Sequence, residues 1–402
     1  MLEIKPIFNA LLRSKVGAVL LLIQIAITTA IVSNAAFIIK DRLDYLNQPT
    51  GYEEENIFKF NVMTFGTDVD LIQQIDLDEQ MLRAMPGVVD AVQISAVPLS
   101  GGGSSTGFRL KPVPEKSKSV NASYFETDEH GLNTLGVNLI AGRNFTEDEV
   151  VLNRDYSKFP KVALATKALM DDLYPGEDGL GKVIYMGDQP LTIVGIIGMM
   201  KGPWLKLENR KDKSVLLPTV SPGKLHQFLV RTEPGRRAEV MKQIESAMHS
   251  NYAKRVIQDL TGLDVKKADY VAEDRLMMRM LVILISVLVL VTALGIFGLT
   301  LFNINKRTKQ IGTRRALGAR KSAIISYFVV ENSLICVAGL VLGVCGAVLL
   351  GQQLMAHYSV PALSNWYVAI TAVAVFVISL LAVIGPARRA ANIDPSIATR
   401  TI

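Results

Sequence analysis

The sequence predicts an α-helical membrane protein with four transmembrane helices and one large α+β extracytoplasmic domain inserted between helices 1 and 2. Three observations predict it: four long apolar runs, basic residues clustered beside those runs, and mixed strand and helix patterns from residue 40 to 279. Half of the 402 residues are hydrophobic and only 20% are charged, a balance too apolar for a soluble protein of this length.

Each apolar run is long enough to cross the hydrocarbon core, which takes about 20 helical residues. We expect the spans at residues 16–39, 280–305, 322–351 and 366–385. The first run follows basic residues, as a secretory signal peptide does, but it is longer than a signal core and no small-residue cleavage site follows it. It therefore favours an uncleaved anchor. Residues 2–12 carry apolar side chains at helical spacing, which is typical of a short interfacial helix, with a disordered start as the alternative.

The loops between the spans set the orientation. Residues 306–321 contain seven Lys or Arg and no acid, whereas residues 352–365 contain no Lys or Arg. By the positive-inside rule the first loop is cytoplasmic, the second lies outside, and both termini lie inside. Residues 40–279 hold 30 Lys and Arg against 34 Asp and Glu, so the net charge of +6 comes from the membrane flanks and argues against nucleic-acid binding.

The segment from 40 to 279 has β-α-β patterns at both ends. In chain order, we expect a strand at 56–63, a helix at 71–85, a strand at 88–97, a strand at 226–232, a helix at 236–250 and a strand at 256–260. The economical interpretation is a split βαβ unit with a β-rich insertion at about 101–222. Residues 269–279 lack Gly and Pro, so we expect a helical stalk that runs into the second span, with a flexible linker as the alternative.

The sequence carries no recognisable catalytic or metal-binding motif. Its four histidines are scattered, and Cys336 and Cys345 lie about 13 Å apart along one predicted helix, too far for a disulfide. It has no H-E-x-x-H motif and no G-x-x-x-x-G-K-[ST] phosphate loop. We therefore expect no enzyme activity, no metal and no cofactor on this chain. Energy must come from a partner or an ion gradient, and a gradient-driven transporter needs more intramembrane ionisable residues than Glu331.

The basic loop is the most informative segment. Residues 307–320 read R-T-K-Q-I-G-T-R-R-A-L-G-A-R, with two glycines as the only helix breakers and with apolar side chains suited to a partner's groove. The other interpretation is a solvated loop that only satisfies the positive-inside rule. The candidate contact residues are Arg307, Gln310, Ile311, Gly312, Arg314, Arg315, Ala316, Leu317, Gly318 and Ala319.

This loop resembles the signature R-T-x-E-I-G-x-R-x-A-x-G-A of the FtsX/MacB-like ABC permeases, with Gln310 in place of the usual Glu. Glu331 matches the acid that these permeases carry early in the third span; the residues alone favour a packing role for it over proton transport. The C-terminal residues that match the family's closing P-A-x-x-A-x-x-x-D-P motif are Pro386, Ala387, Arg388, Asp394 and Pro395. The segments that look like its MacB-type periplasmic core are residues 124–127, 142–145 and 174–182.

The resemblance implies a permease subunit that works with a separate ATPase. Two permeases, identical or paralogous, would pair in the bacterial cell membrane, which is the inner membrane of a Gram-negative cell. Their cytoplasmic loops would act as coupling helices on a dimer of ABC ATPase subunits, which bind ATP and Mg²⁺. In related systems a periplasmic adaptor and an outer-membrane channel complete the route. The expected surroundings are membrane lipid, with no nucleic acid.

Export of a substrate is the favoured function. The alternatives are an ATPase-driven regulator of a cell-wall hydrolase, a lipoprotein-releasing permease, and a membrane-anchored extracytoplasmic enzyme. The empty search for catalytic motifs disfavours the last of these.

Overall fold

The computed structural model describes residues 15–66, 69–153, 158–221, 223–358 and 363–394. They form two units: a helical unit, which includes the chain up to Leu46 and from Asp274 onward, and an α/β unit, Asn47–Glu273. The predicted fold class is confirmed, because an α/β domain separates the first and second of four long apolar helices. The interfacial helix expected at residues 2–12 lies outside the described residues, as does Pro395.

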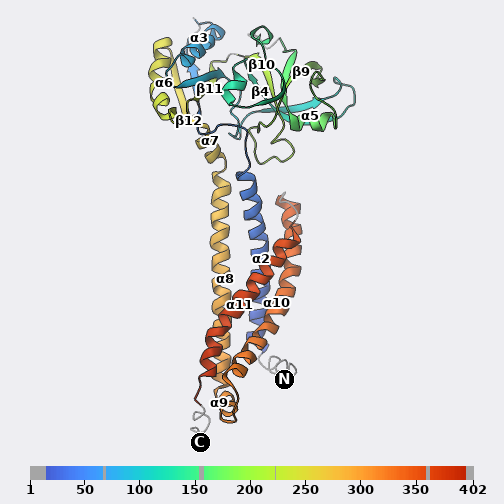
Figure 1. The fold of residues 1–402 in the computed structure, drawn as a ribbon, viewed down its shortest axis with the longest axis vertical. Helices are drawn as coiled ribbons and strands as arrows, with labels where there is room; N and C mark the ends of the chain where they lie inside the picture. Colours follow the sequence, from blue (N-terminus) through green and yellow to red (C-terminus); the bar gives the residue numbers. More distant parts are fainter. Residues whose placement is uncertain (1–14, 67–68, 154–157, 222, 359–362, 395–402) are drawn as a thin grey trace. The chain divides into compact units, whose positions relative to one another are not determined.

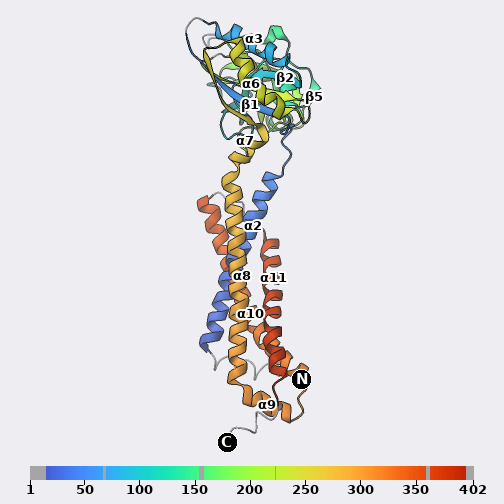
Figure 2. The ribbon, with the colours of Figure 1, turned by 90° about the vertical axis from the view of Figure 1, so that its left-hand side faces the viewer.

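The helical unit contains the four expected spans and one short helix. Its elements are α2 (Lys15–Leu46), α8 (Ala272–Lys306), α9 (Thr308–Ala316), α10 (Lys321–Tyr358) and α11 (Asn365–Ala391). Each long helix extends several residues beyond its apolar run at one end or both. Helices α2, α10 and α11 pack against one another (Figures 1 and 2).

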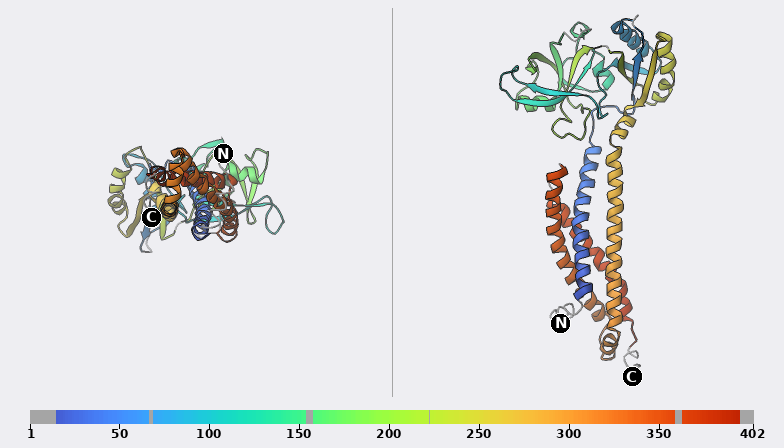
Figure 3. Two further views of the ribbon diagram at one scale, coloured as in Figure 1. Left: turned by 90° about the horizontal axis from the view of Figure 1, so that it is seen from below. Right: turned by 180° about the vertical axis from the view of Figure 1, so that it is seen from behind.

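Small residues allow α10 to approach α2 closely. A β-carbon added to Gly339 would lie 3.0 Å from the Cβ atom of Ile25, and such close approach is the usual reason for glycine in membrane helices. Helix α2 also lies beside α8, as the right-hand view of Figure 3 shows, and the hydroxyl groups of Thr28 and Thr292 are 2.8 Å apart. Hydrogen bonds of this kind satisfy polar groups away from water.

Two helix boundaries differ from the expected ones. Helix α7 (Leu263–Tyr270) ends before Val271, so the stalk expected at 269–279 is interrupted there and only its part from Ala272 is continuous with the second span. The Val271 side chain is fully buried, and tertiary packing of this kind leaves no Gly or Pro signal. At the other end, α11 passes through Pro386 and ends at Ala391, because its last turns pack a buried alanine face that offsets the missing amide hydrogen bond.

The α/β unit contains a four-stranded antiparallel sheet built from two β-α-β units. Its elements are β1 (Ile57–Thr64), α3 (Leu71–Arg83), β2 (Val88–Gln93), β11 (Leu225–Thr232), α6 (Arg237–Asn251) and β12 (Arg255–Gly262). The strand order is β12-β1-β11-β2. Helices α3 and α6 cover one face, where Phe60, Phe228 and Ile244 are fully buried. An ion pair of 2.5 Å between Asp78 and Arg255, both fully buried, ties α3 to β12.

The insertion between β2 and β11 forms a second sheet. Its strands are β3 (Ser104–Arg109), β4 (Ser119–Thr127), β5 (Leu139–Gly142), β6 (Val151–Leu152), β7 (Val162–Thr166), β8 (Val183–Met186), β9 (Gln189–Ile197) and β10 (Ser214–Val220). The path β4-β3-β8-β9-β7-β10 returns to β4, so six strands close into a barrel around an apolar core. Closure leaves those strands without free edges. Helix α5 (Lys167–Leu173) packs on this core.

The residues after β4 join the insertion to the four-stranded sheet. The carboxyl group of Asp128 hydrogen-bonds that of Glu79 on α3. Burial, followed by the negative charge of Asp128, raises the pKa of Glu79 well above its usual value. Two residues on, Nδ1 of His130 lies 3.0 Å from Oδ1 of Asp90. That hydrogen bond raises the pKa of His130.

Candidate functional site

The basic loop between α8 and α10 folds as the nine-residue helix α9. Arg307, at the N-cap, is non-helical and separates α9 from α8. Gly318 adopts a φ of +92°, which a residue with a side chain rarely does, and ends the helix. The amide of Gly318 donates to the carbonyl of Arg315, and that of Ala319 donates to the carbonyl of Arg314. These two bonds form a Schellman motif, so the loop has a defined end rather than a frayed one.

One face of α9 packs into the helical unit. Ile311 is 5% exposed and belongs to a cluster with Ile324 and Phe328 of α10 and with Ala387 of α11. Gly312 is buried beside it. Ile311 therefore anchors the helix to its own chain. This differs from the expectation that Ile311 is available to a partner's groove, because the period of the helix turns it inward.

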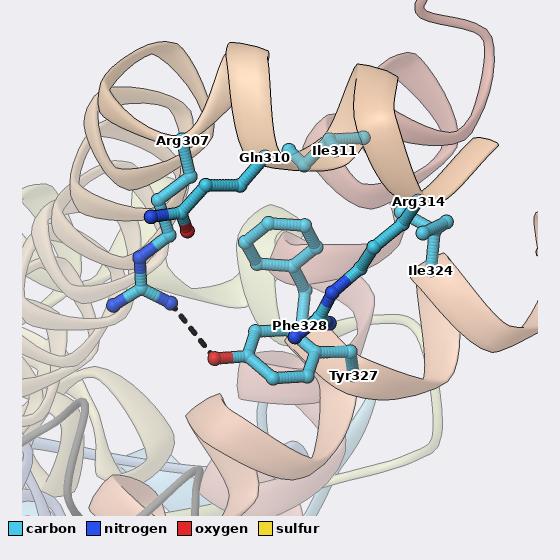
Figure 4. A pocket seen from close by; sticks show the side chains of 7 residues that line it. All are labelled: Arg307, Gln310, Ile311, Arg314, Ile324, Tyr327 and Phe328. Carbon is cyan, nitrogen blue, oxygen red and sulfur yellow. Dashed lines mark hydrogen bonds between the residues drawn. The ribbon is translucent and has the colours of Figure 1, made fainter. Parts of the chain in front are cut away.

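The base of α9 is fixed by an ion pair. Nη1 of Arg307 donates to Oε2 of Glu331 at 3.1 Å and to the hydroxyl of Tyr327 at 3.0 Å (Figure 4 shows the bond to Tyr327). Glu331 is only 4% exposed, and its Oε1 has no hydrogen-bond partner among the described residues. The buried carboxylate thus holds the first residue of the loop.

The opposite face of α9 is open to solvent. Leu317, the C-cap residue of α9, is 83% exposed. The other candidate residues that are exposed are Gln310, Arg314, Ala316 and Gly318. Arg315 and Ala319 are half-buried, and Nη1 of Arg315 donates to the carbonyl of Ala319 at 3.0 Å. The ten candidates thus fall into two groups. Arg307, Ile311 and Gly312 contact the rest of the helical unit, and Leu317 and the other exposed residues face solvent.

The C-terminal motif supports the same region. Pro386 and Ala387 are buried in α11, whereas Arg388 and Asp394 are exposed. Nζ of Lys321, at the start of α10, donates to Oδ1 of Asn392 at 2.7 Å, which joins the end of α11 to the end of the loop. The C-terminal motif therefore contacts the α9 loop through the packing of Ala387 and the neighbouring Asn392–Lys321 hydrogen bond.

Tyr327 and Phe328 belong to this site, although they were not among the sequence candidates. The guanidinium carbons of Arg307 and Arg314 lie 6.0 and 5.4 Å from the centroid of the Tyr327 ring. Tyr327 precedes Glu331 by one helical turn, so the spacing in α10 was an available signal. The described residues contain no group of three His, Cys, Asp or Glu side chains that could hold a metal ion.

Comparisons with known proteins agree on two regions. Residues 16–247 match the model of the MacB-like periplasmic core domain, and residues 282–395 match that of the FtsX-like permease C-terminal region.

Among curated proteins, the chain is 28% identical over 298 residues to the macrolide export ATP-binding/permease protein MacB of Neisseria meningitidis, which covers 68% of this chain and 40% of the relative. It is 23% identical over 413 residues to MacB of Mannheimia succiniciproducens, covering 96% of this chain and 59% of that one. The chain thus spans about two fifths to three fifths of the length of these relatives.

Two solved structures are also similar. The periplasmic region of MacB from Actinobacillus actinomycetemcomitans matches 54% of this chain and 92% of its own, with 15% identity and a TM-score of 0.34. The extracellular domain of the transporter YknZ matches 50% of this chain and all of its own, with 15% identity and a TM-score of 0.31. The core-domain model alone covers more than half of the sequence. The chain therefore belongs to the family of ABC transporter permeases with a MacB-like periplasmic core domain and an FtsX-like C-terminal region.

Proposed function

We propose that this chain is the membrane subunit of an export system, and that it transmits ATP-driven movement of a separate ABC ATPase to its α/β unit. The observation that carries the proposal is the two-sided character of α9. Ile311 and the Arg307–Glu331 pair fix the helix to the transmembrane helices, while Leu317 is presented to solvent. A helix that is fixed on one side and presents an exposed leucine among basic side chains on the other is suited to carry force from a partner.

The charge distribution supports a cytoplasmic position for α9. Its flanks and body hold seven basic residues, whereas the loop between α10 and α11 holds no Lys or Arg. The positive-inside rule then places both termini in the cytoplasm and the α/β unit outside, in a multi-pass protein of the bacterial cell membrane, or of the inner membrane in a Gram-negative cell.

The partners follow from this assignment. ATP and Mg²⁺ would bind to a dimer of ABC ATPase subunits, which α9 would contact. A second permease, identical or paralogous, would complete the pair of coupling helices. A periplasmic adaptor and an outer-membrane channel would extend the route for export.

Leu317 gives the sharpest test. Leu317→Asp should leave expression and membrane insertion unchanged, because the side chain touches little of its own chain, but should abolish stimulation of the ATPase by the permease in nanodiscs. Leu225→Asp is the matched control, since Leu225 is 61% exposed and lies in the α/β unit. Full ATPase stimulation by Leu317→Asp would remove the coupling role of α9.

A labelling experiment tests the orientation independently. In a chain with Cys336→Ala and Cys345→Ala, a cysteine at position 317 should react with a membrane-impermeant thiol reagent only after the membrane is opened. Reaction in intact spheroplasts would place α9 outside and contradict the proposal.

A further inference from the structure

A small pocket lies between α9 and the first turns of α10. Gln310 and Arg314 of α9 line it together with the N-cap residue Arg307, and Tyr327 and Phe328 line it from α10 (Figure 4). Its cavity volume is about 30 Å³, room for about one water molecule, so a larger group would insert a single atom there and remain outside with the rest. The pocket lies at the base of α9, on a different part of the helix from the exposed Leu317.

The polar groups of this pocket are mainly hydrogen-bond donors. Both guanidinium groups lie within 6.0 Å of the centroid of one ring, that of Tyr327, and the amide of Gln310 lies beside them. Two like charges close to one ring repel each other unless anions compensate both, and Glu331 compensates only Arg307. The pocket is therefore complementary to a group that accepts several hydrogen bonds and carries negative charge.

The charge of the pocket is not balanced from within. Glu331 accepts from Nη1 of Arg307, and it does not line the pocket. Arg314 stacks on Tyr327 and makes no ion pair with any residue that the structure describes. No carboxylate stands among the described residues of the lining. One full positive charge is therefore left at the pocket.

The position of the pocket indicates the source of the anion. Tyr327 follows Lys321, the first residue of α10, by six positions, or about 9 Å along the helix axis. The apolar run of α10 begins immediately after Lys321, so Tyr327 lies near the depth where lipid headgroups meet acyl chains. At the matching end of α8, Nζ of Lys306 lies 4.8 Å from the ring centroid of the exposed Phe302, an arrangement typical of a membrane interface.

We propose that this pocket binds the phosphate of an anionic phospholipid headgroup. Arginine forks match phosphate oxygens in geometry, and basic pockets beside transmembrane helices on the cytoplasmic side take such headgroups. The bound phosphate neutralises Arg314 and ties the base of α9 to the bilayer, which leaves Leu317 for the ATPase. The inference rests on the proposed cytoplasmic position of α9, and it adds a ligand to that site.

The test uses the full chain, purified in a nonionic detergent without any ATPase. Native mass spectrometry would count bound dihexanoyl-phosphatidylglycerol, with dihexanoyl-phosphatidylcholine and inorganic phosphate as parallel probes. We expect one phosphatidylglycerol to bind preferentially, and Arg314→Gln to weaken it by about tenfold because the charge-assisted bonds are lost. Arg320→Gln removes the same charge from an exposed site outside the pocket and should change binding by less than about twofold.

A second variant protects the test from misfolding. Gln310→Glu puts a carboxylate into the pocket, beside Arg314, and should abolish binding of phosphatidylglycerol in a chain that retains its melting temperature. If Arg314→Gln and Arg320→Gln weaken phosphatidylglycerol binding equally, the lipid binds to the basic surface in general and not to the pocket, and the proposal is overturned. Equal binding of phosphatidylcholine or preference for free phosphate would overturn it as well. Because no ATPase is needed for binding, failure here is distinct from failure of Leu317→Asp.

Discussion

Gly343 of α10 lies so close to Thr29 of α2 that a β-carbon at Gly343 would be 2.7 Å from the Cβ atom of Thr29. The same β-carbon would be 2.9 Å from the carbonyl oxygen of Ala26. The contact is therefore made with backbone as well as side chain, and α2 cannot relieve it by a change of rotamer. Together with Gly339, one turn earlier, it fixes the distance between the first and third spans.

Gly343→Val should therefore separate α2 from α10. Overpacking of this kind lowers the free energy of unfolding by about 1–3 kcal/mol. Because the added side chain would contact backbone atoms of α2, we expect a loss at the upper end of that range. Thermal unfolding of the purified chain measures the loss. Gly298→Val is the matched control on α8, since a β-carbon at Gly298 would have nothing within 4 Å. Equal stability of the two variants would contradict the packing described here.

Glu331→Gln should loosen α9. It removes the charge that accepts from Arg307 at 3.1 Å, and hydrogen bonds to charged groups are worth about 1.5–3 kcal/mol. We expect a lower melting temperature and weaker stimulation of the ATPase. The double variant Glu331→Gln with Arg307→Gln should recover part of the stability, because no guanidinium is then left unpaired. Exposed Glu273→Gln is the control, and an additive double variant would mean that the pair does not act as a unit.

Glu79→Gln should stabilise the α/β unit at neutral pH. The pKa of Glu79 is raised in the folded state, so the folded protein binds more protons than the unfolded one above about pH 4.3, and its stability falls as pH rises toward the folded pKa. Glutamine replaces the protonated carboxyl without titrating. The melting temperature of the variant should exceed that of the native chain at pH 7 and the difference should shrink toward pH 4. A constant difference across that range would show that the pKa of Glu79 is not raised in the folded state.

Asp78→Asn should strongly destabilise the four-stranded sheet. The side chains of Asp78 and Arg255 are both 0% exposed, and removing one charge from a buried pair costs about 3–5 kcal/mol. Hydrogen exchange of the β12 amides in the full chain would report the loss. Asp76→Asn, on the exposed face of the same helix, is the matched control and should change stability by less than about 0.5 kcal/mol. Similar exchange rates in both variants would argue against a structural role for the pair.

The spans were predictable from sequence because membrane insertion is decided by length and apolarity, which are local properties. The two β-α-β units were predictable for the same reason, since each strand and helix has its own period. The N-terminal and C-terminal halves of the four-stranded sheet were recognised as one split unit, and the structure pairs β1 with both β11 and β12.

The features that could not be predicted from the sequence are those that depend on contacts between residues far apart in the chain. The barrel closes through the pairing of β10 with β4, which begin almost 100 residues apart and carry no local sign of each other. Tyr327 joined the site only because Arg307 reaches it across 20 positions. The break at Val271 and the continuation of α11 through Pro386 likewise depend on which neighbours are buried, and the absence of Gly and Pro at 269–279 did not reveal the break.

The insertion leaves the four-stranded sheet after β2 and returns to it at β11, and these two strands are neighbours in that sheet. Both ends of the insertion therefore lie on adjacent strands of the four-stranded sheet. A different domain could be inserted between β2 and β11 without altering the strands of the four-stranded sheet or the helices that follow them. Diversification of what the α/β unit contacts would then proceed by exchange of the barrel, while the four-stranded sheet and the transmembrane helices are kept.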